Sequence, residues 1–343
     1  MNVRAYLNTV TTQAYSVPIV ILYVTAACNL RCITCSYRNP LPNELTIEEY
    51  RDIFRQLKHL GLRRVVYSGG EPLLRRDLPE ICRIAEGTGA QQSLLTNGLL
   101  LEKRAKEILP FLNEIIVSID GPDAETHNAI RGLESFDQIL RGVETVMASS
   151  GRPSISFRCV IQRRNFKKLD GMVELAKSLG VDRISFLAAD VQTNAFHRDQ
   201  AGHAAPPGDI LLDPKECGEF RQSSKTLFRK RKQEFSSHFI AESPRKIMHL
   251  VEYFEAQHGI SPFPRNECNA PSVSMVITST GEVLPCYFLP SFGSVRTQPL
   301  SILLNTPEIL TTRADVRGYR LKECQHCVCT LKVRPFNALL DAF

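Results

Sequence analysis

The sequence predicts an α/β fold, with six parallel strands rolled into a partial (β/α)6 barrel of the TIM type and a small cysteine-rich unit after it. From residue 17 to residue 190, short β-branched segments alternate with segments of helical periodicity, which favours parallel strands with helical connections. Beyond residue 263, short strands are punctuated by Pro, Gly and Cys instead. An open doubly wound sheet fits the periodicity about as well as the partial barrel does.

The elements follow one another regularly. The expected strands are 17–28, 64–68, 92–96, 114–120, 154–162 and 183–188. The expected helices are 46–60, 78–88, 102–109, 136–149 and 169–179. The first helix has the clearest boundaries, because Thr46 and Glu49 match a capping box and Gly61 ends the helix. On the fourth strand, Ile115, Val117 and Ile119 should face the helices, which leaves Ile116, Ser118 and Asp120 facing the barrel interior.

The regular alternation stops near residue 190. We expect a long loop at 191–212, which contains His197 and His203, followed by helices within 214–256. A hairpin is expected from 273–278 and 282–287, with Gly281 at its turn. The predicted organisation is an N-terminal extension 1–16, a barrel 17–190, a loop and helical connector 191–262, a cysteine-rich domain 263–335 and a tail 336–343.

The chain contains 11 cysteines and shows no export signal or membrane span. Its longest apolar run, Val17–Cys28, is too short to cross a bilayer and contains Pro18. A cytoplasmic location is therefore expected, where thiols stay reduced and act as metal ligands, redox groups or core residues. The net charge of +6 is a mild excess that does not indicate nucleic-acid binding, and the basic run Arg229–Lys232 is typical of a solvated helix face.

Cys28, Cys32 and Cys35 share the loop after the first strand, with C-x3-C-x2-C spacing. Three thiolates on one loop can hold three irons of a 4Fe–4S cluster and leave the fourth iron open to another ligand. A zinc site lacking its fourth ligand, or three reduced core thiols, would also fit the spacing. The position at the C-terminal end of a parallel strand favours an active site.

A second group of cysteines lies in the C-terminal region. Four of them could form a closed iron–sulfur or zinc site, namely Cys268, Cys286, Cys324 and Cys327. Cys329 follows closely and could replace Cys327 as a ligand. The remaining three, Cys82, Cys159 and Cys217, are expected to be plain thiols.

These motifs together resemble the radical S-adenosylmethionine (radical SAM) superfamily over roughly residues 17–190. The stretches that carry the resemblance are CNLRCITC at 28–35, SGGEP at 68–72, TNG at 96–98, SIDGP at 118–122 and HNAIRG at 127–132. One departure is Thr34, where the family usually has an aromatic residue before the third cysteine. Tyr37 is a candidate to pack on the adenine in its place.

The resemblance implies that Cys28, Cys32 and Cys35 bind a 4Fe–4S cluster that chelates S-adenosylmethionine. The strand end at Gly69 and Gly70 would receive the methionine amino group, and the absence of side chains there lets backbone approach a ligand. The full set expected near the cofactor is Gly69, Gly70, Glu71, Asn97, Ser118, Asp120, Arg131 and Arg158. For Arg158 the residue itself adds a reason, because a charge within a buried strand needs a partner.

The C-terminal cysteines resemble the shortened, twitch form of the SPASM domain, which implies one auxiliary 4Fe–4S cluster on Cys268, Cys286, Cys324 and Cys327. The implied reaction is reductive cleavage of S-adenosylmethionine to a 5′-deoxyadenosyl radical, which takes a hydrogen atom from the substrate. We expect a small-molecule substrate, a net oxidation assisted by the auxiliary cluster, and an electron donor such as flavodoxin or ferredoxin. The alternatives are a peptide-modifying maturase and a non-catalytic iron–sulfur or zinc protein.

Overall fold

The computed structural model describes residues 1–193, 195 and 206–340, and its strands form one nine-stranded sheet in the order β6-β5-β4-β3-β2-β1-β7-β8-β9. The strands are β1 Ile19–Thr25, β2 Arg64–Gly69, β3 Gln91–Thr96, β4 Glu114–Ser118, β5 Ser154–Ile161, β6 Arg183–Ala188, β7 Ser274–Ile277, β8 Glu282–Leu284 and β9 Gly293–Ser294. The loop histidines of the sequence analysis, His197 and His203, lie outside the described residues.

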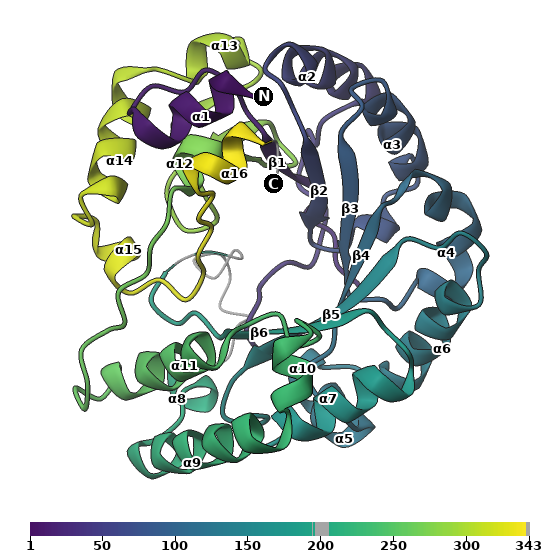
Figure 1. The fold of residues 1–343 in the computed structure, drawn as a ribbon. Helices are drawn as coiled ribbons and strands as arrows, with labels where there is room; N and C mark the ends of the chain where they lie inside the picture. Colours follow the sequence, from purple (N-terminus) through teal and green to yellow (C-terminus); the bar gives the residue numbers. More distant parts are fainter. Residues whose placement is uncertain (194, 196–205, 341–343) are drawn as a thin grey trace.

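The first six strands form the partial barrel that the sequence predicts. Neighbouring strands from β1 to β6 are all parallel, and their order in the sheet follows their order in the chain. The helices between them cover the outside of the curved sheet (Figure 1) and are α2 Ile47–His59, α3 Leu78–Glu86, α4 Leu101–Ile108, α5 Ala124–Arg131, α6 Phe136–Met147 and α7 Leu169–Ser178. A doubly wound sheet reverses its strand order at a switch point, so the open-sheet alternative is wrong.

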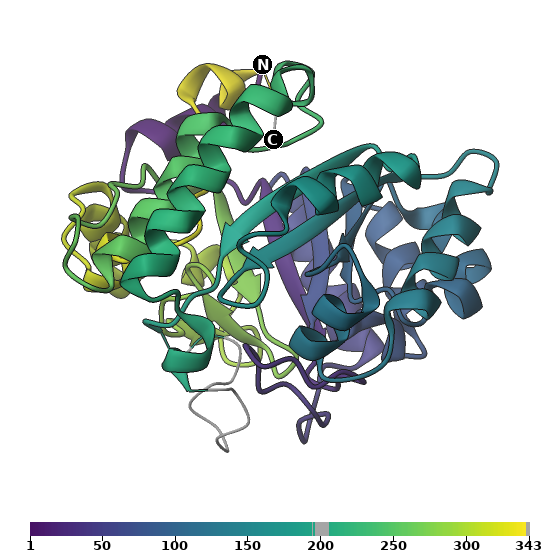
Figure 2. The same cartoon turned by 90° about the horizontal axis from the view of Figure 1, so that it is seen from below.

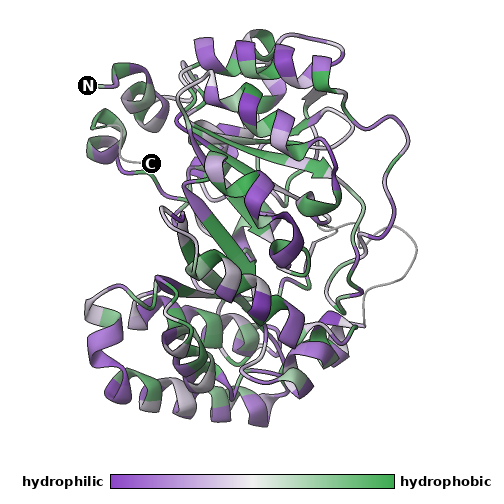
Figure 3. Cartoon of the chain, turned by 90° about the vertical axis from the view of Figure 1, so that its right-hand side faces the viewer, coloured by the Kyte–Doolittle hydropathy of each residue, from purple (hydrophilic) through white to green (hydrophobic). Residues whose placement is uncertain are grey.

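The two faces of β4 differ as expected. Ile115 and Val117 are fully buried on the face that packs against the helices, whereas Ile116 and Ser118 are half-buried on the inner face. Figure 3 shows hydrophobic residues concentrated along the strands and hydrophilic residues frequent on the surrounding helices. The barrel interior is therefore where polar side chains can meet a ligand.

Two element boundaries depart from the prediction for local reasons. β4 ends at Ser118 instead of Asp120, because the backbone N–H of Asp120 donates to His127 Nδ1 over 3.3 Å and leaves the ladder. Helix α5 was not predicted, although Asp123 caps it by accepting a hydrogen bond from the Thr126 backbone. This helix carries the HNAIRG stretch and so matters for the site.

The cysteine-rich region adds to the same sheet. β7 lies parallel to β1, and β8 and β9 follow antiparallel. The predicted hairpin is confirmed, with Gly281 at φ +90° in its turn. The accompanying helices are α12 Ala270–Val273, α13 Leu300–Leu303, α14 Pro307–Arg317, α15 Lys322–Gln325 and α16 Pro335–Leu339. Since the sheet continues through β1 and β7, the division into domains remains a prediction.

The first and the last described helices lie side by side, as Figure 1 shows. Helix α1, Val3–Val10, was not predicted. It packs against α16, and the Asn2 backbone N–H donates to the Leu339 carbonyl over 2.8 Å. Ala5, Val273 and Ala338 are buried together in a small core of their own. The start of the chain is thereby fixed to the cysteine-rich region.

The connector consists of α8 Pro207–Ile210, α9 Pro214–Lys230, α10 Lys232–Ser236 and α11 Pro244–Ala256, and Figure 2 shows its long helices beside the sheet. Ile240 forms a parallel bridge with Ile184 of β6, which seats the connector on the free edge of the barrel. Of the basic run, Arg231 is almost buried and pairs with Asp170 over 2.6 Å, so this part is not the solvated face that the sequence predicts. No helix within the described ranges has the length and apolar character needed to cross a bilayer.

Candidate functional site

The loop with Cys28, Cys32 and Cys35 is held from two sides by backbone hydrogen bonds. On one side, Gly70 and Glu71 follow β2 and donate to the carbonyls of Thr25 and Ala27 over 2.8 and 2.7 Å. On the other side, the Arg31 and Ile33 amides donate to the carbonyls of Arg131 and Ile130 at the end of α5, over 3.1 and 3.0 Å. The conformation of the loop is thus set by the strand end that carries SGGEP and the helix that carries HNAIRG.

Glycine is required at positions 69 and 70, because another part of the backbone passes very close to both. A Cβ on Gly70 would lie 2.1 Å from the Ala27 carbonyl oxygen, and a Cβ on Gly69 would lie 2.4 Å from the Thr25 carbonyl oxygen. The sequence argument placed a ligand at this close approach. In the structure, the neighbour is the backbone that leads into the cysteine loop, because this backbone crosses directly over the end of β2.

Glu71 is fully buried, and three hydrogen-bond donors of the chain converge on its carboxylate. It accepts from the Thr96 hydroxyl over 2.7 Å, the Asn97 backbone N–H over 2.7 Å and the Leu73 backbone N–H over 3.0 Å. Burial raises its pKa, and these donors oppose the shift. We infer that Glu71 positions the TNG turn, which belongs to the expected cofactor surroundings.

Asn97 connects the TNG turn to the cysteine loop. Its Nδ2 donates to Asn29 Oδ1 over 2.8 Å and lies 4.0 Å from Cys28 Sγ. An N–H group directed at a cluster-ligating sulfur is one of the contacts that tune iron–sulfur sites. The placement fits the cofactor role that the sequence analysis gave to Asn97.

Arg131 joins Asp120 to the cysteine loop. One Nη lies 2.7 Å from Asp120 Oδ2, and the other lies 3.7 Å from Cys32 Sγ. Asp120 also accepts a hydrogen bond from the Val160 backbone over 2.8 Å. Burial opposes the charge on Arg131, but Asp120 together with the thiols of Cys32 and Cys159 outweighs this effect and raises the arginine pKa. The expected partner of both residues was the cofactor, whereas here they are partners of each other.

The cysteine loop suits the cluster that the sequence implies. Its three cysteines form no disulfide in the described structure, and desolvation raises the pKa of Cys28 to about 11 and of Cys35 to about 12. Thiols whose pKa is raised must lose their protons when a metal binds. Three sulfurs on one loop, with N–H donors from Asn97 and Arg131 beside two of them, are chemically suited to hold an iron–sulfur cluster.

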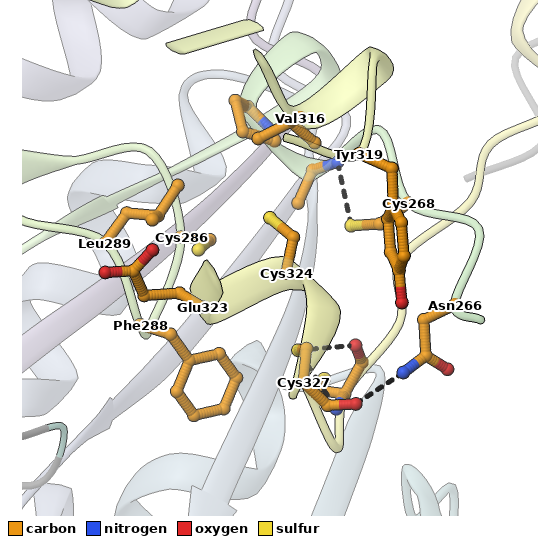
Figure 4. Close-up of a pocket in the computed structure, with 13 residues that line it drawn as sticks. Asn266, Cys268, Cys286, Phe288, Leu289, Val316, Tyr319, Glu323, Cys324 and Cys327 are labelled. Atoms are coloured by element: carbon orange, nitrogen blue, oxygen red, sulfur yellow. Dashed lines mark hydrogen bonds between the residues drawn. The ribbon is translucent and has the colours of Figure 1, made fainter. Parts of the chain in front are cut away.

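The second group of cysteines lines one pocket, which Figure 4 shows in close-up. The thiols around it are those of Cys268, Cys286, Cys324, Cys327 and Cys329. The hairpin therefore returns Cys286 toward Cys268, as predicted. Within the described residues, no three or more His, Cys, Asp or Glu side chains are arranged to hold a single metal ion.

Five thiols at this pocket are one more than a closed four-thiolate site needs. Cys327 Sγ turns onto its own loop and lies 2.9 Å from the Cys329 carbonyl oxygen. Burial raises the pKa of Cys329, and the nearby cations Arg158 and Lys246 oppose this. Cys329 thus lies within electrostatic reach of both cations.

Arg158 is on the inner face of β5, with its Nε donating to Ser185 Oγ over 3.2 Å. It is the register partner of Ser118, so both predicted residues lie on the same wall of the barrel. Sequence reasoning missed two neighbours, Glu242 and Lys246, which come from the connector. Burial raises the pKa of Glu242 to about 7, while Arg158 and Lys246 oppose the shift.

Comparison with known proteins gives two family matches. The radical SAM superfamily profile matches residues 22–186, and an iron–sulfur cluster-binding domain profile, SPASM, matches residues 268–328. The two matched ranges contain both groups of candidate ligands. Cys329 lies just outside the second range.

Full-length relatives and a solved structure agree with these matches. An AdoMet-dependent heme synthase of Methanosarcina barkeri is 29% identical over 322 residues, covering 89% of each chain. A PqqA peptide cyclase of Rhizobium meliloti is 30% identical over 294 residues, covering 81% of this chain and 71% of its own. The crystal structure of Streptococcus suis SuiB bound to S-adenosylmethionine matches with a TM-score of 0.63 at 16% identity, covering 92% of this chain and 73% of that one.

The fold, the two cysteine groups and the matches lead to one assignment. The relatives are named as enzymes, so the non-catalytic alternative is wrong. The cofactors are S-adenosylmethionine, a 4Fe–4S cluster and auxiliary iron–sulfur chemistry in the C-terminal region. The chain belongs to the radical SAM superfamily and carries a SPASM iron–sulfur cluster-binding domain.

Proposed function

We propose that this enzyme oxidises a small-molecule biosynthetic intermediate that carries an anionic group. When bound, S-adenosylmethionine and its cluster supply a 5′-deoxyadenosyl radical that abstracts a hydrogen atom from substrate carbon. The observation that carries the proposal is that two cations, Arg158 of β5 and Lys246 of α11, both lie within electrostatic reach of Glu242 and of Cys329. A radical formed in the barrel would lie next to this group.

The proposed ligands divide between the two ends of the chain. Cys28, Cys32 and Cys35 hold the cluster that binds S-adenosylmethionine. Cys268, Cys286, Cys324 and Cys327 hold the auxiliary cluster. Asn97 and Arg131 support the first set through their N–H groups, which lie 4.0 Å from Cys28 Sγ and 3.7 Å from Cys32 Sγ.

Anion recognition is assigned to Arg158 and Lys246. The Arg158 guanidinium is anchored by Ser185 at one nitrogen, which leaves other N–H groups for a planar carboxylate. Burial lowers the pKa of Lys246, while Glu242 and the thiols around it oppose this. An anionic substrate group would join Glu242 in balancing both cations.

Glu242 is the proposed proton acceptor of the oxidation. Loss of a hydrogen atom, then of a proton and an electron, converts a saturated substrate carbon into an oxidised one. The Glu242 carboxylate is held by the Phe186 backbone N–H over 2.8 Å, and its pKa of about 7 is suited to accept that proton. The auxiliary cysteines lie beside Lys246 and would place the electron acceptor nearby.

A peptide substrate is the second candidate, supported by the relative named as a PqqA peptide cyclase. The heme synthase relative, which covers 89% of both chains, supports the small-molecule class. An electron donor of the flavodoxin or ferredoxin type and a cytoplasmic location belong to the same proposal. The cations at the inner wall favour the small anionic substrate.

The test uses anaerobically reconstituted enzyme with S-adenosylmethionine and dithionite. Iron near about eight per chain and formation of 5′-deoxyadenosine are expected. Iron coproporphyrin III, a tetrapyrrole with several carboxylates, and the PqqA peptide are then compared as substrates, with mass spectrometry of the products. Oxidised tetrapyrrole, lost in Arg158→Met, supports the proposal. Modified PqqA with unchanged tetrapyrrole would overturn the small-molecule assignment, and no 5′-deoxyadenosine would overturn the radical chemistry.

A further inference from the structure

Three tyrosines form a stack inside the barrel between the two cysteine groups. Tyr23 lies on β1, and its ring centroid is 6.2 Å from that of Tyr37 in an edge-to-face arrangement. On the other side, Tyr23 stacks on Tyr287 with the same centroid distance and an interplanar angle of 22°. Both distances fall within the range of favourable aromatic pairs.

The ends of this stack are fixed next to proposed cluster ligands. Tyr37 follows Cys35 by two residues, and Tyr287 follows Cys286 directly. Burial is the main cause that raises the pKa of Tyr23, and both of these thiols add to it, so Tyr23 lies within electrostatic reach of the two groups. The hairpin that carries Tyr287 is held in place because β7 pairs with β1, the strand of Tyr23.

We propose that Tyr37, Tyr23 and Tyr287 form an electron-transfer bridge between the auxiliary cluster and the cluster that binds S-adenosylmethionine. This inference rests on the proposed function, since it requires both clusters. The π systems of adjacent rings shorten the gaps that an electron must cross through otherwise saturated protein.

The bridge explains how the electrons of a net oxidation balance. One electron is consumed when S-adenosylmethionine is cleaved to methionine and the 5′-deoxyadenosyl radical. One electron is released when the substrate radical loses its proton to Glu242 and becomes product. An electron that returns from the auxiliary side through the tyrosines restores the starting redox state, so turnover consumes S-adenosylmethionine without net consumption of external reductant.

The experiment needs no substrate, because the 5′-deoxyadenosyl radical then takes its hydrogen atom from the buffer or the protein, and each 5′-deoxyadenosine still reports one electron consumed in cleavage. Reconstituted enzyme is fully reduced, the reductant is removed by anaerobic desalting, and S-adenosylmethionine is added. The yield of 5′-deoxyadenosine is measured against time, and the EPR signal of the reduced auxiliary cluster is followed in parallel. Tyr23→Leu removes the central ring, whereas Tyr23→Phe is the matched control that keeps the ring and loses only the hydroxyl. Tyr287→Leu interrupts the stack at its auxiliary end.

In the wild type and Tyr23→Phe, about two equivalents of 5′-deoxyadenosine should form per chain while the auxiliary EPR signal disappears. In Tyr23→Leu and Tyr287→Leu, about one equivalent should form in the same time and the auxiliary signal should persist. Iron content and the EPR spectra before addition show that each variant contains both clusters. A persistent auxiliary signal in the wild type, or equal yields in Tyr23→Leu and wild type, would overturn the bridge. A wild type that forms no 5′-deoxyadenosine contradicts the proposed function instead.

Discussion

Arg131 forms a buried ion pair with Asp120, with 2.7 Å between a guanidinium nitrogen and Oδ2. The second Nη group of Arg131 lies 3.7 Å from Cys32 Sγ, so the pair connects the end of β4 to the cysteine loop. Only 3% of the Asp120 side chain and 12% of the Arg131 side chain are exposed. Removing one partner would leave the other charge buried without compensation.

Asp120→Asn tests this pair. The substitution keeps the size of the side chain but removes the charge, and we expect it to lower the free energy of unfolding by about 3–5 kcal/mol. The control is Asp315→Asn, which breaks a pair of the same 2.7 Å length with the exposed Arg320 and should cost less than about 1 kcal/mol. Anaerobic urea unfolding of the reconstituted proteins provides the comparison. Equal costs for the two variants would contradict the role of burial.

Gly70→Ala tests the close approach beneath the cysteine loop. The added Cβ would lie 2.1 Å from the Ala27 carbonyl oxygen, and backbone on both sides cannot give way without moving the loop. We expect the variant to lose about half of its iron, because only the cluster on Cys28, Cys32 and Cys35 is affected.

The matched control for that variant is Gly218→Ala in the exposed part of α9. A Cβ there meets nothing within 4 Å, and alanine is the better helix former by about 1 kcal/mol. This variant should keep its iron and gain slightly in stability. Full iron in Gly70→Ala, measured by colorimetric assay and EPR, would show that the loop tolerates the displacement.

The sequence predicted those parts of the site that depend on residues close together in the chain. The spacing of Cys28, Cys32 and Cys35 and the alternation along β4 depend on near neighbours in the chain, and the structure has the expected strand and loop there. The partners of Asp120 and Glu71 could not be predicted in the same way. They depend on contacts to α5 and to the TNG turn, which only the closed barrel brings together.

No pattern in the sequence indicated that the connector supplies residues to the site. Glu242 lies in a segment with no motif, and it reaches the barrel only because Ile240 pairs with the free edge of β6. The run that contains Tyr23 predicts a buried strand, and nothing near it in the sequence distinguishes Tyr23 from its neighbours. Its position between two cysteine groups follows from the pairing of β1 with β7, which joins segments that lie far apart in the chain.

Cys327 and Cys329 can be distinguished by substitution. Both line the auxiliary pocket, and the proposed ligand set uses Cys327. Cys327→Ala should then lose the auxiliary cluster and retain about four irons per chain, whereas Cys329→Ala should retain about eight. Iron and labile-sulfide analysis with EPR of the reduced proteins gives the result. The reverse pattern would make Cys329 the ligand, within electrostatic reach of Arg158 and Lys246.

Glu242 should make stability depend on pH in a defined direction. Burial raises its pKa from 4.5 to about 7, so the folded chain keeps a proton that the unfolded chain releases at lower pH. The resulting contribution to the free energy of unfolding is fully present below about pH 4.5. It falls as the pH rises toward about 7 and is lost above that. Glu242→Gln keeps an oxygen to accept the hydrogen bond from the Phe186 backbone but cannot titrate. Relative to wild type, this variant should therefore gain about 2–4 kcal/mol between pH 5 and pH 8, as measured by urea unfolding at each pH. If the free energies of unfolding of the two proteins changed in parallel with pH, the pKa of Glu242 would have its ordinary value. Glu242 would then be ionised throughout this range and unsuited to the proposed proton transfer.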